Sequence, residues 1–246
     1  MRRKLQKQGA LQVAENQGCK VSQARHAVLA GPVYAMSLTK LVPLSKSGCA
    51  ASLVVQPTVI AFHGRKIFIY CRNMVVAQDV DAFVELAVRL RHRADIGFLL
   101  IGRGSEVSRL RGVAQKRGLD NLRIDDQVSP VELAGLMAHC HAGIVALHPG
   151  HGTHNIPGKL LTYLQAGLPV LARVNPGNDL HRLVLDEGIG ASVVGTSLDS
   201  LVQAAAWLAD CPGAREEMGS RGRALSDRLF SPAAAAAQVV RGLTAR

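Results

Sequence analysis

Residues 143 to 172 read GIVALHPGHGTHNIPGKLLTYLQAGLPVLA, and this stretch decides the fold. An apolar run enters a polar loop rich in glycine and histidine, a short helical pattern follows, and Gly167-Leu168-Pro169 then starts a second apolar run. The order strand, loop, helix, strand places the loop at the carboxyl end of a parallel strand. The free N–H groups of the following helix can hold an anion there.

The polar residues of this stretch suit a phosphorylated, hydroxylated ligand. Lys159 lies near the start of the predicted helix and adds a positive charge, while Asn155 and Thr162 offer neutral hydrogen bonds suited to hydroxyl groups. An alternative needs no ligand, because Gly-x-Pro-Val after a helix is also an ordinary helix stop followed by a strand.

The run from Asn155 to Ala172 also resembles the donor-site signature of family 4 glycosyltransferases, specifically those that build bacterial lipopolysaccharide and surface polysaccharide. In that family the loop and helix contact the sugar, diphosphate and ribose of a nucleotide-sugar. The resemblance covers about residues 66–240. It implies the donor half of a two-domain GT-B enzyme, transfer with retention of anomeric configuration, and no cofactor, since the nucleotide-sugar is the substrate.

Outward from this stretch, apolar runs alternate with helical patterns, which predicts an α/β, Rossmann-like, doubly wound parallel sheet. The expected strands are Lys66 to Tyr70, Gly97 to Gly102, Leu122 to Ile124, Gly143 to Leu147, Pro169 to Arg173 and Ala191 to Val194. Besides the central helix, the expected helices are Asp79 to Arg93, Ser105 to Gly118, Ser129 to His141, Asp179 to Glu187, Leu198 to Ala209, Pro212 to Leu229 and Pro232 to Leu243. We expect one such domain over residues 64–246.

Residues 1–63 show no sustained period, and we expect a basic, poorly ordered or atypical leader there. Residues 1–65 hold nine Lys or Arg against one acid, Glu15, so +8 of the net charge of +11 lies in this quarter. A basic arm can bind nucleic acid or an anionic membrane surface. Aromatic residues are almost absent from it, so a solvated leader is favoured and nucleic acid is not an expected partner.

The composition indicates the cellular compartment of the protein. With 48% hydrophobic residues the chain has enough apolar matter for a core, yet no window approaches the length of a membrane helix and no signal peptide is evident. We therefore expect a cytoplasmic protein, with peripheral contact at the inner face of the membrane open. The five cysteines are scattered, which predicts reduced, structural thiols.

Two further loops are candidates for the donor site. By the resemblance, Arg72 and Asn73 lie in the loop beside the donor diphosphate, with Arg72 at a position where glycine is usual. Arg72 could contact phosphate or block the cradle. Gly102-Arg103-Gly104 ends the next strand, which could place Arg103 near the nucleotide, although a turn with an N-cap would need no ligand. The resemblance places the base near Val128.

The resemblance also assigns His154, Asn155, Ile156, Lys159 and Thr162 to the donor site. His154 and Thr162 stand at the two acidic positions of the family's paired-glutamate motif, so both acids are absent. The histidines of residues 139–154 could suggest zinc, but no Cys or acid completes a set, and we expect no metal.

The expected function is transfer of sugar from a nucleotide-sugar to a lipid-linked or lipopolysaccharide acceptor. Because no acceptor-binding domain is recognisable in residues 1–63, we expect a truncated product, weakly active or inactive alone, or a subunit that needs an acceptor-domain partner chain. The alternative is a non-catalytic nucleotide-binding module or a degenerate remnant of such an enzyme.

Overall fold

The computed structural model describes residues 58, 61–148, 156–231, 234, 236 and 240. His154 and Asn155, most of the expected leader, and most of the expected last helix therefore lie outside the described residues.

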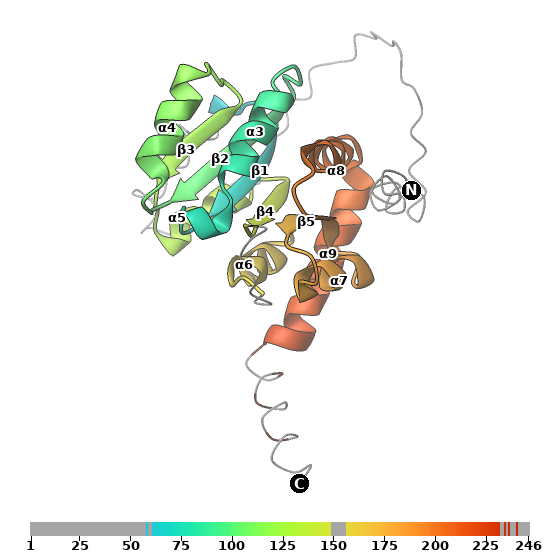
Figure 1. Ribbon diagram of the computed structural model, residues 1–246. Helices are drawn as coiled ribbons and strands as arrows, with labels where there is room; N and C mark the ends of the chain where they lie inside the picture. Colours follow the sequence, from blue (N-terminus) through green and yellow to red (C-terminus); the bar gives the residue numbers. More distant parts are fainter. Residues whose placement is uncertain are drawn as a thin grey trace, which may run out of the picture.

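Six parallel strands form one sheet in the order β3-β2-β1-β4-β5-β6. This order reverses direction between β1 and β4, as in a doubly wound nucleotide-binding fold, so the predicted fold class is confirmed. The strands are almost wholly buried because helices cover both faces (Figure 1). Their bounds are β1 Lys66–Cys71, β2 Ile96–Gly102, β3 Leu122–Asp126, β4 Ala142–Ala146, β5 Val170–Val174 and β6 Gly190–Val194.

Alternate residues of the central strands supply two separate apolar cores. Phe68 and Tyr70 of β1 pack on one face with α3 (Asp81–Arg89), α4 (Val107–Lys116) and α8 (Leu198–Asp210). Ile67, Ile69 and Cys71 pack on the other face with helices α5 (Pro130–Met137), α6 (Lys159–Ala166), α7 (Asp179–Asp186) and the carboxyl-terminal half of α9 (Pro212–Phe230). The second face carries the site described below.

Helix α3 starts two residues later than the periodicity predicts. Val76–Gln78 form a short 3-10 helix, η2, and Asp79 ends it with a left-handed backbone, φ 45°. That backbone cannot continue into an α-helix, so α3 begins only at Asp81.

Helix α5 matches its predicted start but ends early. The Ser129 side chain accepts from the Glu132 N–H, the Glu132 carboxylate accepts from the Ser129 N–H, and Pro130 is the first helical residue, as predicted. The predicted end at His141 is wrong, since α5 stops at Met137. The His141 N–H donates to the Ile67 carbonyl at 2.8 Å, so by this point the chain has already joined the sheet.

Phe62 lies before the first strand and is buried against the sheet. A Cβ on Gly97 of β2 would lie 2.4 Å from its ring, so this small residue makes room for it. The described fold thus includes Phe62, while the boundary of the predicted leader at residue 63 stays a prediction.

Candidate functional site

A cleft of about 910 Å³ opens on the α5, α6 and α9 face of the sheet. We call it the donor cleft, only because several of the residues expected at the donor site line it. The ends of β1 and β2 form one end, α5 and α6 form the walls, and α9 contributes one arginine. Its size suits a small organic ligand. The lining residues used below are Cys71, Arg72, Asn73, Arg103, Gln127, Val128, Cys140, Thr162, Gln165 and Arg223.

Arg72 enters this cleft from a strained backbone. Its φ is 93°, a region that costs a non-glycine residue about 1–2 kcal/mol. The guanidinium Nη2 donates to Thr162 Oγ1 at 3.2 Å, across 90 positions of sequence. Arg72 and Thr162, two of the residues that depart from the family pattern, therefore contact each other, and Arg72 is exposed in the cleft.

The backbone around Arg72 is held by the next loop. The Arg72 N–H donates to the Ile101 carbonyl at 2.9 Å, and the Met74 N–H donates to the Arg103 carbonyl at 2.8 Å. A Cβ on Gly102 would lie 1.8 Å from the Arg72 carbonyl oxygen. Only glycine lets the two chains approach this closely, so Gly102 helps to fix where Arg72 and Arg103 enter the cleft.

The donor cleft is positively charged. Arg72, Arg103 and Arg223 line it, and no Asp or Glu is among the described residues that do so. Arg223 also donates to the Ala166 carbonyl at 3.1 Å and so caps the end of α6. The cleft can therefore attract an anion, with Arg72 and Arg103 exposed at the carboxyl ends of their strands.

Elsewhere in the described part of the chain the arginines are mostly neutralised. It contains sixteen arginines, and eleven of them form ion pairs with Asp or Glu. Three of the five others line the donor cleft. Charge left unpaired in one cleft is typical of a site for an anionic ligand.

Lys159 lies beside this cleft rather than on its wall. It is the first residue of α6 and only 5% exposed. Its Nζ lies 2.5 Å from Gln78 Oε1 and 4.0 Å from the centre of the Tyr70 ring. Burial lowers the pKa of Lys159 to about 8, and the Arg72 charge adds to this shift.

The segment η2 is fastened to the second half of the sheet. The Gln78 side chain binds Lys159, the Asp79 carboxylate pairs with the buried Arg173 of β5, and the Ala77 carbonyl accepts from the His148 N–H at 3.0 Å. These contacts bridge the point between β1 and β4 where the strand order reverses. They hold the end of β1 in a fixed place above α6.

The two thiols on the cleft wall are not nucleophiles. Burial raises the pKa of both Cys71 and Cys140, so both thiols stay protonated near neutral pH. The Tyr163 hydroxyl oxygen accepts from the Cys71 backbone N–H at 3.0 Å. The cleft is therefore suited to binding, with no activated thiol for covalent chemistry.

Of the nine donor-site residues predicted from the sequence, the structure brings five together. Arg72, Asn73, Arg103, Val128 and Thr162 all line the donor cleft. Lys159 is buried behind it, and Ile156 is partly exposed before α6 and does not line it. His154 and Asn155 lie outside the described residues. That these residues bind a donor stays a prediction.

Several residues of the site were not predicted from the sequence. Arg223 reaches the cleft from α9, and Gln78 and Tyr70 surround the Lys159 amine. No rule of sequence spacing relates α9 to α6, so the position of Arg223 in the cleft could not be predicted. Gln165 could have been found, because it lies three residues after Thr162 and so shares its face of α6.

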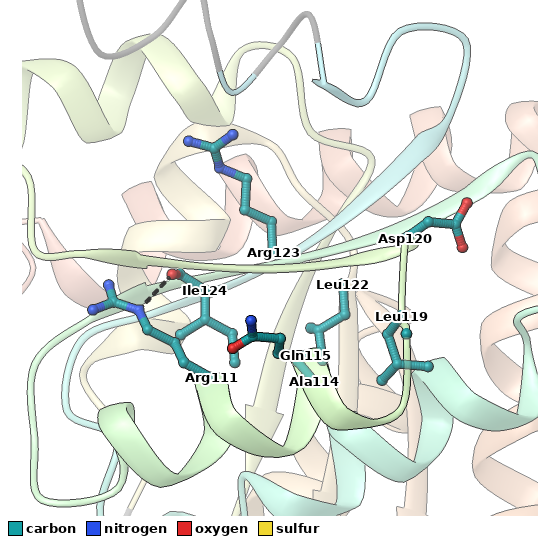
Figure 2. Close-up of a pocket in the computed structure, with 9 residues that line it drawn as sticks. Arg111, Ala114, Gln115, Leu119, Asp120, Leu122, Arg123 and Ile124 are labelled. Atoms are coloured by element: carbon teal, nitrogen blue, oxygen red, sulfur yellow. Dashed lines mark hydrogen bonds between the residues drawn. The ribbon is translucent and has the colours of Figure 1, made fainter.

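A second hollow of about 470 Å³ lies at the edge of the sheet, between α4 and β3 (Figure 2). Arg111 crosses it to donate to the Ile124 carbonyl at 2.9 Å and to Asp126 at 2.9 Å. Arg123 pairs with Asp125. The local charges are thus satisfied by the chain itself, unlike those of the donor cleft.

His141, one of the histidines considered for a metal, has another role in the structure. His141 Nδ1 accepts from the Ile67 N–H at 3.0 Å, and burial lowers the pKa of His141 to about 4. In the described part of the chain, no group of three or more His, Cys, Asp or Glu is arranged to hold a metal ion. Nor is any described helix long and apolar enough to cross a membrane.

Comparison with known proteins decides the family. The family described as "Glycosyl transferases group 1" matches residues 57–225, which is more than half of the chain. The chain belongs to the group 1 glycosyl transferases. Its resemblance to the glycosyltransferases of bacterial polysaccharide synthesis is thereby confirmed at the level of the family.

One relative of this glycosyltransferase domain is WcaI of Escherichia coli (strain K12), whose name assigns it to glycosyl transfer in colanic acid biosynthesis. The two are 30% identical over 141 residues, which cover 56% of this chain and 34% of WcaI. The chain thus spans about a third of the length of this relative.

Solved glycosyltransferase structures share the fold. Anabaena HepE in complex with UDP-glucose gives a TM-score of 0.65 at 13% identity and covers 82% of this chain and 54% of HepE. The catalytic domain of the Helicobacter pylori cholesterol-alpha-glucosyltransferase gives 0.56 at 18% identity, covering 66% of this chain and 97% of that domain. At these identities the likeness concerns the GT-B fold alone.

Proposed function

We propose that this chain binds the nucleotide-sugar donor of a glycosyltransferase in the donor cleft, with the donor diphosphate beside Arg72 and Arg103. One observation carries the proposal: these two guanidinium groups are exposed at the carboxyl ends of β1 and β2, in a cleft whose described wall has no acid. Ligands of open parallel sheets bind at such ends. Arginine is suited to phosphate because its fork of N–H groups can bind two oxygens.

The rest of the donor follows the wall of the cleft. Val128 and Gln127 line it where the family resemblance places the base. Thr162 lies at the ribose position, and its hydroxyl already accepts from Arg72. The ribose would then be held by an arginine and a hydroxyl in place of a carboxylate, which leaves the whole site cationic.

The reaction we propose is transfer of the sugar, with retention, to a lipid-linked or lipopolysaccharide acceptor. Arg72 and Arg103 would stabilise the negative charge that develops on the leaving nucleoside diphosphate, and this stabilisation is often the largest contribution to catalysis. The colanic acid role in the name of WcaI supports a polysaccharide acceptor. The complex of HepE with UDP-glucose supports a uridine nucleotide as the first donor to test.

Calorimetric titration of the purified chain with UDP and GDP tests the donor site. Replacing Arg72 or Arg103 with alanine removes a charged hydrogen bond to phosphate of about 1.5–3 kcal/mol, so we expect dissociation constants at least tenfold higher. Arg91→Ala is the matched control, since Arg91 is another arginine without an ion pair and does not line the cleft. Equal affinity in all four proteins, or no saturable binding, would refute the donor site.

The alternative of a non-catalytic nucleotide-binding module needs a second measurement. Expression of the chain in a strain with a surface-polysaccharide defect should restore the polymer if the chain contributes to transfer, alone or with an acceptor-domain partner. Failure of complementation, together with intact UDP binding, would favour the binding module.

A further inference from the structure

We propose that nucleotide binding in the donor cleft is coupled to uptake of a proton at Lys159, so that donor affinity falls in alkaline solution. The proposal rests on the proposed function, because the donor anion drives the uptake. It would make Lys159 the titrating group of the site rather than a permanent positive charge.

The Lys159 amine occupies a site made of neutral groups. Gln78 Oε1 accepts from Nζ at 2.5 Å, and the Tyr70 ring lies with its centre 4.0 Å away. Tyr70 is itself fixed, because its hydroxyl donates to the Asn73 carbonyl at 2.5 Å. An amide oxygen and an aromatic face can hold either the ammonium or the neutral amine, so the site tolerates both protonation states.

No acid of the described chain neutralises this buried ammonium. The nearest carboxylate along the η2 segment, that of Asp79, is paired with Arg173. The sequence between residues 149 and 155 contains no Asp or Glu. The titratable and charged groups of the surrounding elements are Tyr70, Cys71 and Arg72 at the end of β1, Asp79 after η2, His148 after β4, Tyr163 on α6 and Arg173 on β5.

Arg72 couples the amine to the cleft. Its positive charge lowers the pKa of Lys159, and the same guanidinium is exposed where the diphosphate is proposed to bind. A bound diphosphate would neutralise Arg72 and add its own negative field. Both effects favour the ammonium form, so the pKa of Lys159 rises from about 8 when the nucleotide binds.

Among the described residues around Lys159, few other groups can take up this proton above pH 8. Burial raises the pKa of Tyr70 and Tyr163 beyond the working range, and the Cys71 thiol is also held protonated. A histidine with its ordinary pKa near 6.5 is already neutral. At pH 8.5 about a quarter of the Lys159 amines are already protonated without nucleotide, so up to about three quarters of a proton should enter per nucleotide bound. Affinity for UDP should fall by up to about tenfold between pH 7.5 and 9.

Calorimetry of the whole chain with UDP at pH 8.5, in Tris and in bicine, measures the uptake. Each proton that the protein takes up is released by the buffer, so the measured heat differs between the two buffers. Lys159→Arg should bind UDP with almost no uptake, since a guanidinium is always protonated. Gln78→Glu should also lose it, because a carboxylate there protonates Lys159 before UDP arrives. Lys116→Met is the control, with an exposed lysine on α4 removed and uptake unchanged.

The outcomes separate this inference from the proposed function. UDP binding without proton uptake, or equal uptake in Lys159→Arg and the wild type, would overturn the coupling and leave the donor site standing. If the wild type binds no UDP over the whole range from pH 7 to pH 9, both the coupling and the donor site are overturned.

Discussion

At the scale of single residues, burial of Lys159 has a cost that can be measured without any ligand. Because the pKa of Lys159 is about 8 in the fold and near 10.5 in an unfolded chain, the unfolded state binds more protons between these values. The loss in the free energy of unfolding caused by burying this charge is complete below pH 8 and becomes smaller as the pH rises toward 10.5. We expect Lys159→Met to raise the free energy of unfolding at pH 7 by about 1–3 kcal/mol.

This gain should shrink at pH 10, where the wild-type amine is already neutral in the fold. Urea denaturation at the two pH values measures both differences, with Lys116→Met as the exposed control. A gain for Lys159→Met of the same size at pH 7 and pH 10 would show that the lysine is not desolvated as the structure indicates.

At the scale of elements, the close contact between the loops after β1 and β2 should limit what the sequence can tolerate. A Cβ at position 102 would lie 1.8 Å from the Arg72 carbonyl oxygen, and no side-chain rotation can relieve a contact between backbone atoms. We expect Gly102→Ala to lower the free energy of unfolding by about 2 kcal/mol or more and to weaken UDP binding, because the Arg72 backbone must move.

Gly112→Ala is the matched change on α4. Open space surrounds this position, so the added methyl group should stabilise the helix by about 0.5–1 kcal/mol and leave UDP binding unchanged. Thermal unfolding and calorimetry of the two variants make the comparison. Equal stability of both would mean that the two loops are not held together as described.

At the scale of the whole molecule, both apolar cores lie within residues 62–225. They share one sheet, so they should unfold together. We expect a fragment of residues 57–231 to show a single cooperative transition in circular dichroism and to bind UDP within about threefold of the whole chain, since it keeps every described residue of the donor cleft. A fragment without cooperative unfolding would show that the fold needs residues outside this range.

The sequence by itself determined the order of strands and helices, the parallel sheet and the loops that carry the site. These follow from local physics: apolar runs identify buried strands, and the Ser129 to Glu132 capping box identifies the start of α5. The errors arise where local rules do not apply. The left-handed backbone of Asp79 and the early entry of His141 into the sheet depend on neighbours distant in sequence.

Only the tertiary structure decided how the charges of the site are arranged. It pairs Arg72 with Thr162, encloses Lys159 between Gln78 and Tyr70, and brings Arg223 to the cleft. Residues 80 to 90 positions apart meet in this way because the strand order places β1 next to β4, and that order leaves no trace in hydrophobic periodicity. Burial, and with it the pKa of Lys159, depends on this packing, so the sequence could name the lysine but could not assign its state.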